Sequence, residues 1–333
     1  MARLGFCGAV RARAGSHLQT FCGHIASRSE RPFRRRISCG KTPRLADKVS
    51  PTASMPTVGA HALPTSGADR PAFSFGVIAD VQWADLPNGT NFARTRRRHY
   101  RGSLHVLRAA VDWWNALIAS DVPELDLNFV ADLGDLIDGQ NSRLDASHAA
   151  MGAALSELRR CAAPLLVHSP GNHELYNFER GKLPPSYRPV AGEEGFFGAL
   201  RPAPGYRVIM LDGYAEGTLG WPAQDPRADA AHKLLARHNP NLDRGVAGPS
   251  RGHNNSKGSS RASGWFDGLD GPRRRWVPYN GALGQAQRAR LEAELSSASA
   301  EGEIVLILSH VVLHPKARDA VDSVVVCLNT IAL

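Results

Sequence analysis

Several apolar segments of this sequence each stop at a side chain that can bind a metal ion or transfer a proton. In chain order, these side chains are Asp80, Gln82, Asp135, Asn172, His173 and His310. Carboxylates, amide oxygens and imidazoles form a ligand set that suits Mn²⁺, Fe or Zn²⁺ better than a soft metal ion. The residue types therefore predict a site for a divalent metal, assembled from segments that are far apart in the chain.

One of these segments, FVADLGDLIDGQN, crowds three aspartates, Asp132, Asp135 and Asp138, among its apolar residues. Carboxylates at this spacing repel one another, so the segment is either a surface turn or a place that needs a cation. Taken alone, an aspartate after a strand is usually a turn or a helix cap, and a single histidine is usually a packed side chain. Four segments that carry suitable groups in a suitable order form a much more specific pattern.

The elements that must position these groups alternate between strands and helices. Short apolar runs predict five strands, at residues 73–80, 125–135, 164–174, 206–214 and 303–315. Apolar residues at helical spacing predict three helices, at residues 94–119, 143–161 and 283–298. This alternation predicts an α/β fold, in which functional groups gather at the carboxyl ends of the strands.

The basic charge of the chain lies in its first 70 residues. Residues 1–70 contain 12 Lys and Arg against 3 Asp and Glu, whereas the rest contains 28 of each, which accounts for the net charge of +9. The part beyond residue 70 therefore has no net attraction for nucleic acid. The Arg- and Ser-rich tail, which has no long apolar stretch, predicts a disordered transit peptide and linker that direct the protein to a plastid or mitochondrion. A basic tail on a cytoplasmic protein is the alternative.

Beyond the tail, residues 71–333 form one predicted domain, interrupted by a flexible insertion at about 222–275 that is rich in Gly, Ser, Asn, Arg and Pro. No run of about 18 or more uncharged apolar residues occurs, so neither a membrane-spanning helix nor a membrane partner is expected. The 5 cysteines include no CxxC pair, which argues against a disulfide framework or a thiolate zinc site. The sequence leaves the oligomeric state open.

The order of the ligand-bearing motifs resembles that of the calcineurin-like metallophosphoesterase superfamily. The motifs are Asp80-Val81-Gln82, Gly134-Asp135-Leu136-Ile137-Asp138, Gly171-Asn172-His173-Glu174 and Ser309-His310. Gln82 stands where the superfamily usually has histidine, and this departure resembles one branch, the manganese-dependent ADP-ribose/CDP-alcohol diphosphatases. The stretches SPGNHELYNF, YNGALGQAQ and LSHVVLHP also fit that branch, and the likeness covers about residues 73–315.

The resemblance implies a sandwich of two sheets flanked by helices and a site for two divalent cations, Mn²⁺ above all, with Fe or Zn²⁺ as alternatives. One cation would be held by Asp80, Gln82 and Asp135, and the other by Asp135, Asn172 and His310. His173 would stabilise the transition state or protonate the leaving oxygen, and Phe92 matches an aromatic residue on which a nucleotide base could stack. Asp138 would support the site, and Asp132 would lie beside it without binding metal.

The resemblance also implies the reaction, which is metal-dependent hydrolysis of the phosphoanhydride bond in a nucleoside diphosphate derivative such as ADP-ribose or a CDP-alcohol. The products would be a nucleoside monophosphate and a second phosphate ester, so the expected partner is a nucleotide-like small molecule. A generic metallophosphatase or phosphodiesterase is the alternative within the same superfamily.

One superfamily motif, Gly-His-x-His, which supplies a histidine to each metal, does not occur after His310. The only later histidine, His314, belongs to the branch's Leu-His-Pro. We therefore expect the sequence to be truncated at its C-terminus and to bind each metal ion more weakly. An inactive form that lacks two metal-binding histidines is a further alternative.

Overall fold

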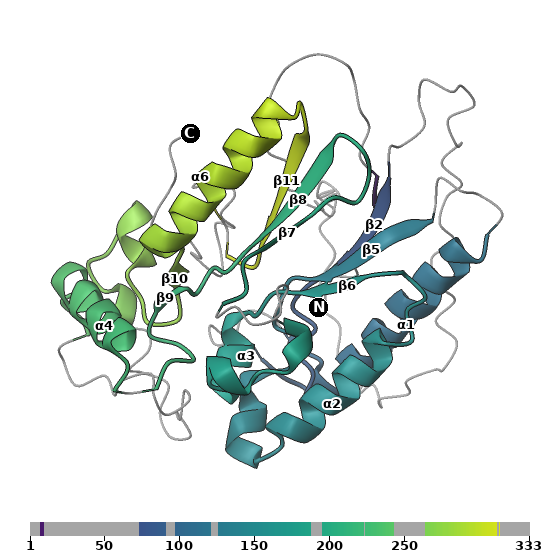
Figure 1. Cartoon of the computed structure of the whole chain (residues 1–333). Helices are drawn as coiled ribbons and strands as arrows, with labels where there is room; N and C mark the ends of the chain where they lie inside the picture. Colours follow the sequence, from purple (N-terminus) through teal and green to yellow (C-terminus); the bar gives the residue numbers. More distant parts are fainter. Residues whose placement is uncertain are drawn as a thin grey trace, which may run out of the picture. The chain divides into compact units, whose positions relative to one another are not determined.

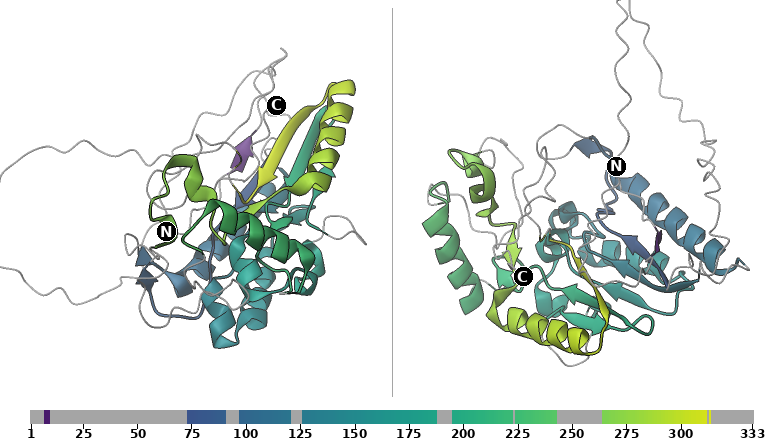
Figure 2. Two further views of the ribbon diagram at one scale, coloured as in Figure 1. Left: turned by 90° about the vertical axis from the view of Figure 1, so that its left-hand side faces the viewer. Right: turned by 90° about the horizontal axis from the view of Figure 1, so that it is seen from above.

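The computed structural model describes residues 7–9, 73–90, 97–120, 126–187, 195–222, 224–242, 264–311 and 313 of the chain. Within these ranges, two β-sheets pack face to face and helices cover their outer faces (Figure 1). Figure 2 shows the same arrangement from the side and from above. The α/β class predicted from the sequence pattern and the two-sheet sandwich implied by the resemblance are both confirmed.

The first sheet has the strand order β1-β2-β5-β6. Strands β2 (Ser74–Ile78), β5 (Leu127–Asp132) and β6 (Leu166–His168) run parallel to one another. Strand β1 (Cys7–Ala9) pairs antiparallel with β2 and belongs to the predicted N-terminal tail. The rest of residues 1–70, and with it the transit-peptide prediction, lies outside the described residues.

The second sheet has the strand order β11-β8-β7. Its central strand β8 (Tyr206–Leu211) pairs parallel with β11 (Ile304–Ser309) and antiparallel with β7 (Gly198–Leu200). Every residue of β8 is buried, as expected for an interior strand covered on both faces. All five predicted strands are present, and each is shorter than its predicted span. The third predicted strand, for example, ends at His168, and its last predicted residues begin helix α3.

Aromatic side chains fill the space between the two sheets. The rings of Phe75 and Phe129, on neighbouring strands of the first sheet, stack with their centroids 4.9 Å apart. Phe73 meets Tyr206 of the second sheet edge-on, with a centroid separation of 5.2 Å. Full burial of a side chain of this size contributes roughly 1.5–3 kcal/mol, so these rings hold the two sheets together.

Helices cover the outer faces of both sheets. Helices α1 (Tyr100–Ile118) and α2 (Ser147–Leu158) lie against the first sheet, and α6 (Gly284–Ala300) lies along the second (Figure 1). The apolar face predicted for α1 is buried, as Leu107 and Trp114 show. The three predicted helices are therefore confirmed, and their apolar faces supply the outer layers of the core.

The segment at 222–275, predicted to be a flexible insertion, contains regular structure. Helix α4 (Pro226–His238) begins at Asp225, whose carboxylate accepts the backbone N–H of Arg227 at 2.9 Å. An aspartate followed by proline is a helix-start signal, although the Gly- and Ser-rich composition around it hides this helix from a composition-based prediction. The Gly- and Ser-rich run itself, at 243–263, lies outside the described residues.

Short elements connect the longer ones. They are β3 (Gly89–Thr90), β4 (Arg97–Arg98), η3 (Gly139–Leu144), α3 (Asn172–Asn177), η4 (Arg180–Lys182), η5 (Pro185–Tyr187), β9 (Glu216–Gly217), η6 (Gly264–Phe266), η7 (Gly271–Arg275) and β10 (Gly281–Ala282). No helix within the described ranges is long and apolar enough to cross a membrane.

Candidate active site

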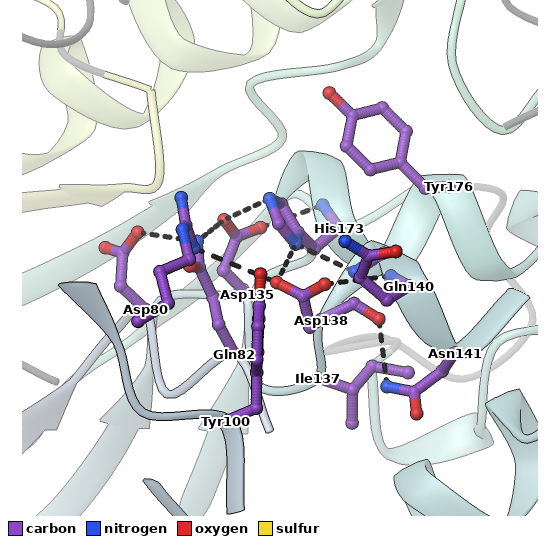
Figure 3. A network of polar contacts seen from close by, with 12 residues as sticks. Asp80, Gln82, Tyr100, Asp135, Ile137, Asp138, Gln140, Asn141, His173 and Tyr176 are labelled. Carbon is purple, nitrogen blue, oxygen red and sulfur yellow. Dashed lines mark hydrogen bonds and ion pairs between the residues drawn. The ribbon is translucent and has the colours of Figure 1, made fainter. Parts of the chain in front are cut away.

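The five predicted metal ligands lie together at the carboxyl ends of the strands, around the carboxylate of Asp135. Asp80 and Gln82 follow β2, Asp135 follows β5, Asn172 begins α3 after β6, and His310 follows β11. Oδ2 of Asp135 lies 2.9 Å from Nε2 of Gln82, and its Oδ1 lies 3.7 Å from Nε2 of His310. His310 Nε2 is also 3.3 Å from Oδ1 of Asn172. Nε2 of Gln82 lies 3.4 Å from Oδ1 of Asp80, which completes the cluster (Figure 3).

The backbone at three of these ligands is strained. Asp80, Gln82 and Asp135 have φ angles of 57°, 48° and 58°, in the left-handed region that residues other than glycine avoid. Each such residue costs on the order of 1–2 kcal/mol, so neighbouring groups must hold the conformation. The N–H groups of Asp80 and Gln82 donate to the carbonyls of Gly134 (3.0 Å) and Asp135 (2.7 Å). Strain concentrated at the candidate ligands is typical of a functional site.

A buried carboxylate that has no role in the sequence-based prediction ties two of the ligand-bearing loops together. Glu174 accepts N–H groups from Asp135 and Leu136, each at 2.7 Å, and from Gly171 at 2.8 Å. Burial and the charges of Asp135 and Asp132 raise the pKa of Glu174 to about 7, against the lowering effect of these N–H groups. The spacing Gly171-x-x-Glu174 is that of a helix capping box, from which the contact to the N–H of Gly171 could have been predicted. No local signal indicates the contacts to Asp135 and Leu136.

Two glycines let these loops approach each other closely. Gly134 has a φ of 99°, and a Cβ atom there would collide with the backbone nitrogen of Gly171. A Cβ atom at Gly171 would collide with Oδ1 of Asp135 and lie 2.7 Å from Cε1 of His310. Any side chain at either position would therefore displace candidate ligands.

His310 and Asn172 are held so that their electron-pair donors face each other. Nδ1 of His310 lies 2.8 Å from the carbonyl oxygen of Leu133, which places the ring proton on Nδ1 and leaves a lone pair on Nε2. The amide nitrogen of Asn172 donates to the hydroxyl of Tyr176 at 3.0 Å, and Tyr214 donates its hydroxyl to the amide oxygen at 3.3 Å. The oxygen of Asn172 consequently faces Nε2 of His310.

A divalent cation fits this arrangement. A carboxylate, an amide oxygen and an imidazole lone pair that face one another repel unless a proton or a metal ion lies between them. Burial lowers the pKa of His310, but Asp135 and Asp80 raise it more, so a proton is drawn to the place that a cation would fill. Among the residues described, no group of three or more His, Cys, Asp or Glu side chains could hold a metal ion unaided. The amide oxygen of Asn172 already faces this place, whereas the amide of Gln82 presents its nitrogen to Asp80 and Asp135 and would turn its oxygen toward a cation.

His173, the predicted catalytic residue, lies beside the ligands with a proton directed at them. Its Nδ1 accepts the backbone N–H of Gly139 at 2.9 Å and lies 3.4 Å from Oδ2 of Asp138. The shorter contact places the proton of the neutral ring on Nε2, which lies 3.8 Å from Oδ2 of Asp135 (Figure 3). Burial lowers the pKa of His173, but Asp135 and Asp138 raise it more, to about 9. Nε2 therefore carries a proton in both the neutral and the charged ring.

Asp138 lies behind His173, and its role as a supporting residue stays a prediction. Its Oδ1 accepts the N–H of Gln140 at 2.8 Å and caps η3, which fixes the carboxylate. Its Oδ2 faces Nδ1 of His173 and lies 3.8 Å from Nη1 of Arg98. Burial and the charge of Asp138 raise the pKa of Tyr100, whose side chain is drawn beside Asp138 in Figure 3. The carboxylate thus balances two basic groups and binds no candidate ligand directly.

Known proteins are similar to this chain in sequence and in fold. No protein-family model matches the chain. Three similar proteins are each named manganese-dependent ADP-ribose/CDP-alcohol diphosphatase. The one from Arabidopsis thaliana is 37% identical over 251 residues, which is 75% of this chain and 71% of that protein. The one from Danio rerio is 34% identical over 265 residues (76% and 74%), and the one from Homo sapiens is 34% identical over 270 residues (77% and 71%). The chain belongs to this family.

A solved structure agrees with the family assignment. The crystal structure of a dimetal phosphatase from Danio rerio is 34% identical to this chain, with a TM-score of 0.60, and the match covers 74% of this chain and 71% of that one. The chain is accordingly a metal-dependent phosphoesterase, and the predictions of superfamily, fold and enzyme class are confirmed.

The roles of individual residues stay predictions, although the structure brings all five candidate ligands and His173 together. Phe92, predicted to contact the substrate, lies outside the described residues, so its role also stays a prediction. The sequence-based prediction missed Tyr176 and Tyr214, which orient Asn172. Tyr176 follows Asn172 by four residues on α3, a spacing that places two side chains on one helix face and could have indicated the contact. No local signal points to Tyr214, which comes from the second sheet.

Proposed function

We propose that this chain hydrolyses the phosphoanhydride bond of nucleoside diphosphate derivatives, such as ADP-ribose and CDP-alcohols, to a nucleoside monophosphate and a second phosphate ester. The observation that carries the proposal is the cluster of carboxylate, amide and imidazole groups from four strand ends around Asp135. The names of the relatives support the substrate class, because the alignment with the Arabidopsis thaliana protein covers 71% of its length.

Two divalent cations, Mn²⁺ as in the names of the relatives, would complete the site. Asp80, Gln82 and Asp135 would hold one cation, and Asp135, Asn172 and His310 would hold the other. Such a pair of cations supplies Lewis acidity toward a phosphoryl oxygen and a nucleophile from water at neutral pH. The charge of Asp135, shared between both positions, would offset the repulsion between two cations, and this explains why a buried strand leads into carboxylates.

His173 supplies the proton that the reaction needs. Hydrolysis forms a bond from a water oxygen to phosphorus and breaks the bond from phosphorus to the bridging oxygen, which leaves with a negative charge. Nε2 of His173 carries a proton and lies 3.8 Å from Oδ2 of Asp135, the carboxylate that both cations would share. Donation of this proton would neutralise the leaving oxygen and leave the ring neutral, the form in which Nδ1 accepts the N–H of Gly139. In the charged ring that precedes this step, Nδ1 would instead donate to Asp138, 3.4 Å away.

The substitution Asp135→Asn tests the site. Asparagine tolerates the left-handed backbone and keeps the size of the side chain, but it removes the charge. We expect Mn²⁺-dependent hydrolysis of ADP-ribose, followed as AMP release, to fall by about 10²–10³-fold or more. Asp145→Asn is the matched control, because Asp145 has a φ of 54° but ends η3 and contacts no candidate ligand in the described part of the chain. Equal losses in the two variants would show that the effect comes from backbone strain and not from the site.

The substrate class is tested separately, with the purified full chain and Mn²⁺. We expect kcat/KM for ADP-ribose or CDP-choline to exceed that for bis(p-nitrophenyl) phosphate, with AMP or CMP as a product. A chelator such as EDTA should abolish all three activities, and added Mn²⁺ should restore them. Equal or higher kcat/KM for bis(p-nitrophenyl) phosphate would leave a generic phosphodiesterase as the function.

A further inference from the structure

Asp132 is a buried carboxylate that the proposed reaction does not use. It is the last residue of β5, and only 1% of its surface is exposed. In the register of the first sheet it stands directly beside His168 of β6. A carboxylate in such surroundings costs several kcal/mol unless hydrogen bonds satisfy its oxygens, so its partners indicate what it does.

Both oxygens of Asp132 have partners. Oδ1 accepts the backbone N–H of Gly134 at 3.0 Å, which closes a turn at the end of the strand. Oδ2 lies 3.1 Å from Nδ1 of His168 and accepts the hydroxyl of Tyr187 at 3.4 Å. The rings of His168 and Tyr187 pack against each other with their centroids 5.1 Å apart. One oxygen is therefore anchored in the core while the other holds the turn.

This turn presents its backbone to ligands from two other strands. The carbonyl oxygen of Leu133 lies 2.8 Å from Nδ1 of His310 and fixes the orientation of that ring. The carbonyl of Gly134 accepts the N–H of Asp80 at 3.0 Å. The next residue along the chain is Asp135. A single turn thus positions three of the five candidate ligands, which come from the ends of three different strands.

We propose that Asp132, anchored by His168, is a positioning residue that sets the geometry of the metal site through the turn at Leu133 and Gly134. It does not bind the metal itself, because its oxygens are engaged with Gly134, His168 and Tyr187. The inference deepens the proposed function and rests on it, since both concern the same site. Without the carboxylate, the N–H of Gly134 loses its partner and the turn loses the side chain that closes it.

Two substitutions at Asp132 separate positioning from packing. Asp132→Asn keeps an oxygen that can accept the N–H of Gly134, whereas Asp132→Leu keeps a similar volume and removes both hydrogen bonds. We expect Asp132→Leu to weaken Mn²⁺ binding, measured by titration calorimetry, by about 10–100-fold, the usual loss when a group that orients metal ligands is removed. Asp132→Asn should stay within about threefold of the unsubstituted chain, because the contact to Gly134 remains.

A second measurement needs no metal. Amide hydrogen exchange over residues 130–136 should be faster in Asp132→Leu than in Asp132→Asn, because only the former releases the turn. Thr218→Val is the matched control for loss of a buried hydrogen bond. The hydroxyl of Thr218 donates to the carbonyl of Pro278 at 2.7 Å and takes no part in the ligand cluster. This control should lower stability without changing the affinity for Mn²⁺.

Two results would overturn the proposal. One is an affinity of Asp132→Leu for Mn²⁺ equal to that of Thr218→Val, and the other is a loss in Asp132→Asn as large as that in Asp132→Leu. If Asp132→Leu does not fold, Asp132→Val replaces it under the same criteria, since a branched side chain suits a strand. Calorimetry with Mn²⁺ alone uses no nucleotide, so failure of the unsubstituted chain to release AMP or CMP would be recognised as failure of the proposed function instead.

Discussion

The interior strands β5 and β8, one in each sheet, lead into the same kind of turn. Oδ1 of Asp132 accepts the N–H of Gly134, and Oδ1 of Asp212 accepts the N–H of Tyr214, each at 3.0 Å. The two turns deliver different groups to the site. The β5 turn offers two backbone carbonyls and continues into Asp135, whereas the β8 turn offers one phenolic hydroxyl. The same local structure therefore positions metal ligands in one sheet and supports them from a distance in the other.

The anchors of the two turns differ as well. The second oxygen of Asp132 faces an imidazole and a phenol, while that of Asp212 is paired with the guanidinium of Arg180. Arg180 is buried, with its guanidinium 4.6 Å from the ring centroid of Phe196 and 4.5 Å from that of Trp221. A guanidinium stays charged at all relevant pH values, so this pair depends on both partners. The turn nearer the candidate ligands is thus the one that is anchored without a guanidinium.

The largest expected effect is a difference in unfolding free energy between variants of Asp212 and Asp132. Asp212→Ala leaves the guanidinium of Arg180 buried without its partner and should cost about 3–5 kcal/mol of unfolding free energy. Asp132→Ala removes the acceptor of the Gly134 N–H and the Tyr187 hydroxyl and should cost about 1–3 kcal/mol. Urea denaturation of both variants measures the difference. The double variant Arg180→Met with Asp212→Leu is the control and should recover much of the loss. Equal losses for the two aspartates would remove the distinction between the anchors.

The next effect concerns the buried carboxylate on the β5 side. Glu174→Gln keeps the shape of the side chain but replaces one accepting oxygen by an NH₂ group that faces backbone N–H donors. We expect a loss of roughly 1–3 kcal/mol in unfolding free energy, together with Mn²⁺ binding about 10–100-fold weaker, because the loops of Asp135 and Gly171 are no longer tied together. Urea denaturation and titration calorimetry on one preparation give both numbers. Unchanged Mn²⁺ affinity would show that Glu174 stabilises the fold without positioning ligands.

The candidate ligands could be predicted from the sequence because each of them follows an apolar run. Asp80, Asp135 and His310 end three predicted strands, and parallel strands bring their carboxyl ends to one edge. Alternation of strands and helices likewise gave the α/β class. The two-sheet arrangement came only from the resemblance, since apolar periodicity does not tell whether five strands form one sheet or two.

The anchors could not be predicted, because packing alone selects their partners. Asp132 and His168 are 36 residues apart, and Arg180 and Asp212 are 32 apart, with no local pattern that pairs them. Charged residues usually lie at the surface, so the composition of the chain does not predict buried charges of this kind. Helix α4 was missed for a different reason, since its start signal is present at Asp225 but lies in a segment whose composition favours loops.

A smaller effect tests whether the turn after β8 contributes to metal binding. Tyr214→Phe removes the hydroxyl that donates to the amide oxygen of Asn172 at 3.3 Å and keeps the ring. We expect Mn²⁺ binding to weaken by roughly 3–10-fold, equivalent to about 1 kcal/mol for one hydrogen bond. Thr218→Val is the control for loss of one buried hydroxyl, because its hydroxyl donates to the carbonyl of Pro278 at 2.7 Å and takes no part in the ligand cluster. If the two variants bind Mn²⁺ alike, the β8 turn has no separate part in the site.

The smallest effect is expected for an ion cluster at the surface of the helix layer. Its contribution to stability is the value with which the contributions of the buried Asp132 and Asp212 are compared. Glu157 accepts hydrogen bonds from Arg108 (2.5 Å) and Arg160 (2.8 Å), and these bonds lower the pKa of Glu157 to about 2. Because this pKa lies below that of the unfolded chain, the contribution to stability is complete above about pH 4.5 and is lost as the pH falls toward 2. Both arginine side chains are 44% exposed, so solvent screening limits the contribution to about 0–1 kcal/mol.

Urea denaturation of Glu157→Gln beside the unsubstituted chain measures this contribution. The difference in unfolding free energy should be below about 1 kcal/mol at pH 7, should shrink as the pH is lowered from 4.5, and should also shrink in 1 M salt. The direction follows from the proton balance: at low pH the glutamate of the unsubstituted chain is itself protonated, so the glutamine variant loses nothing further. A loss of unfolding free energy as large as that of Asp132→Ala, independent of pH and salt, would contradict this expectation. Exposed ion pairs would then stabilise the fold as much as the buried partners of Asp132 and Asp212 do, and the difference between the ends of β5 and β8 would not explain their stability.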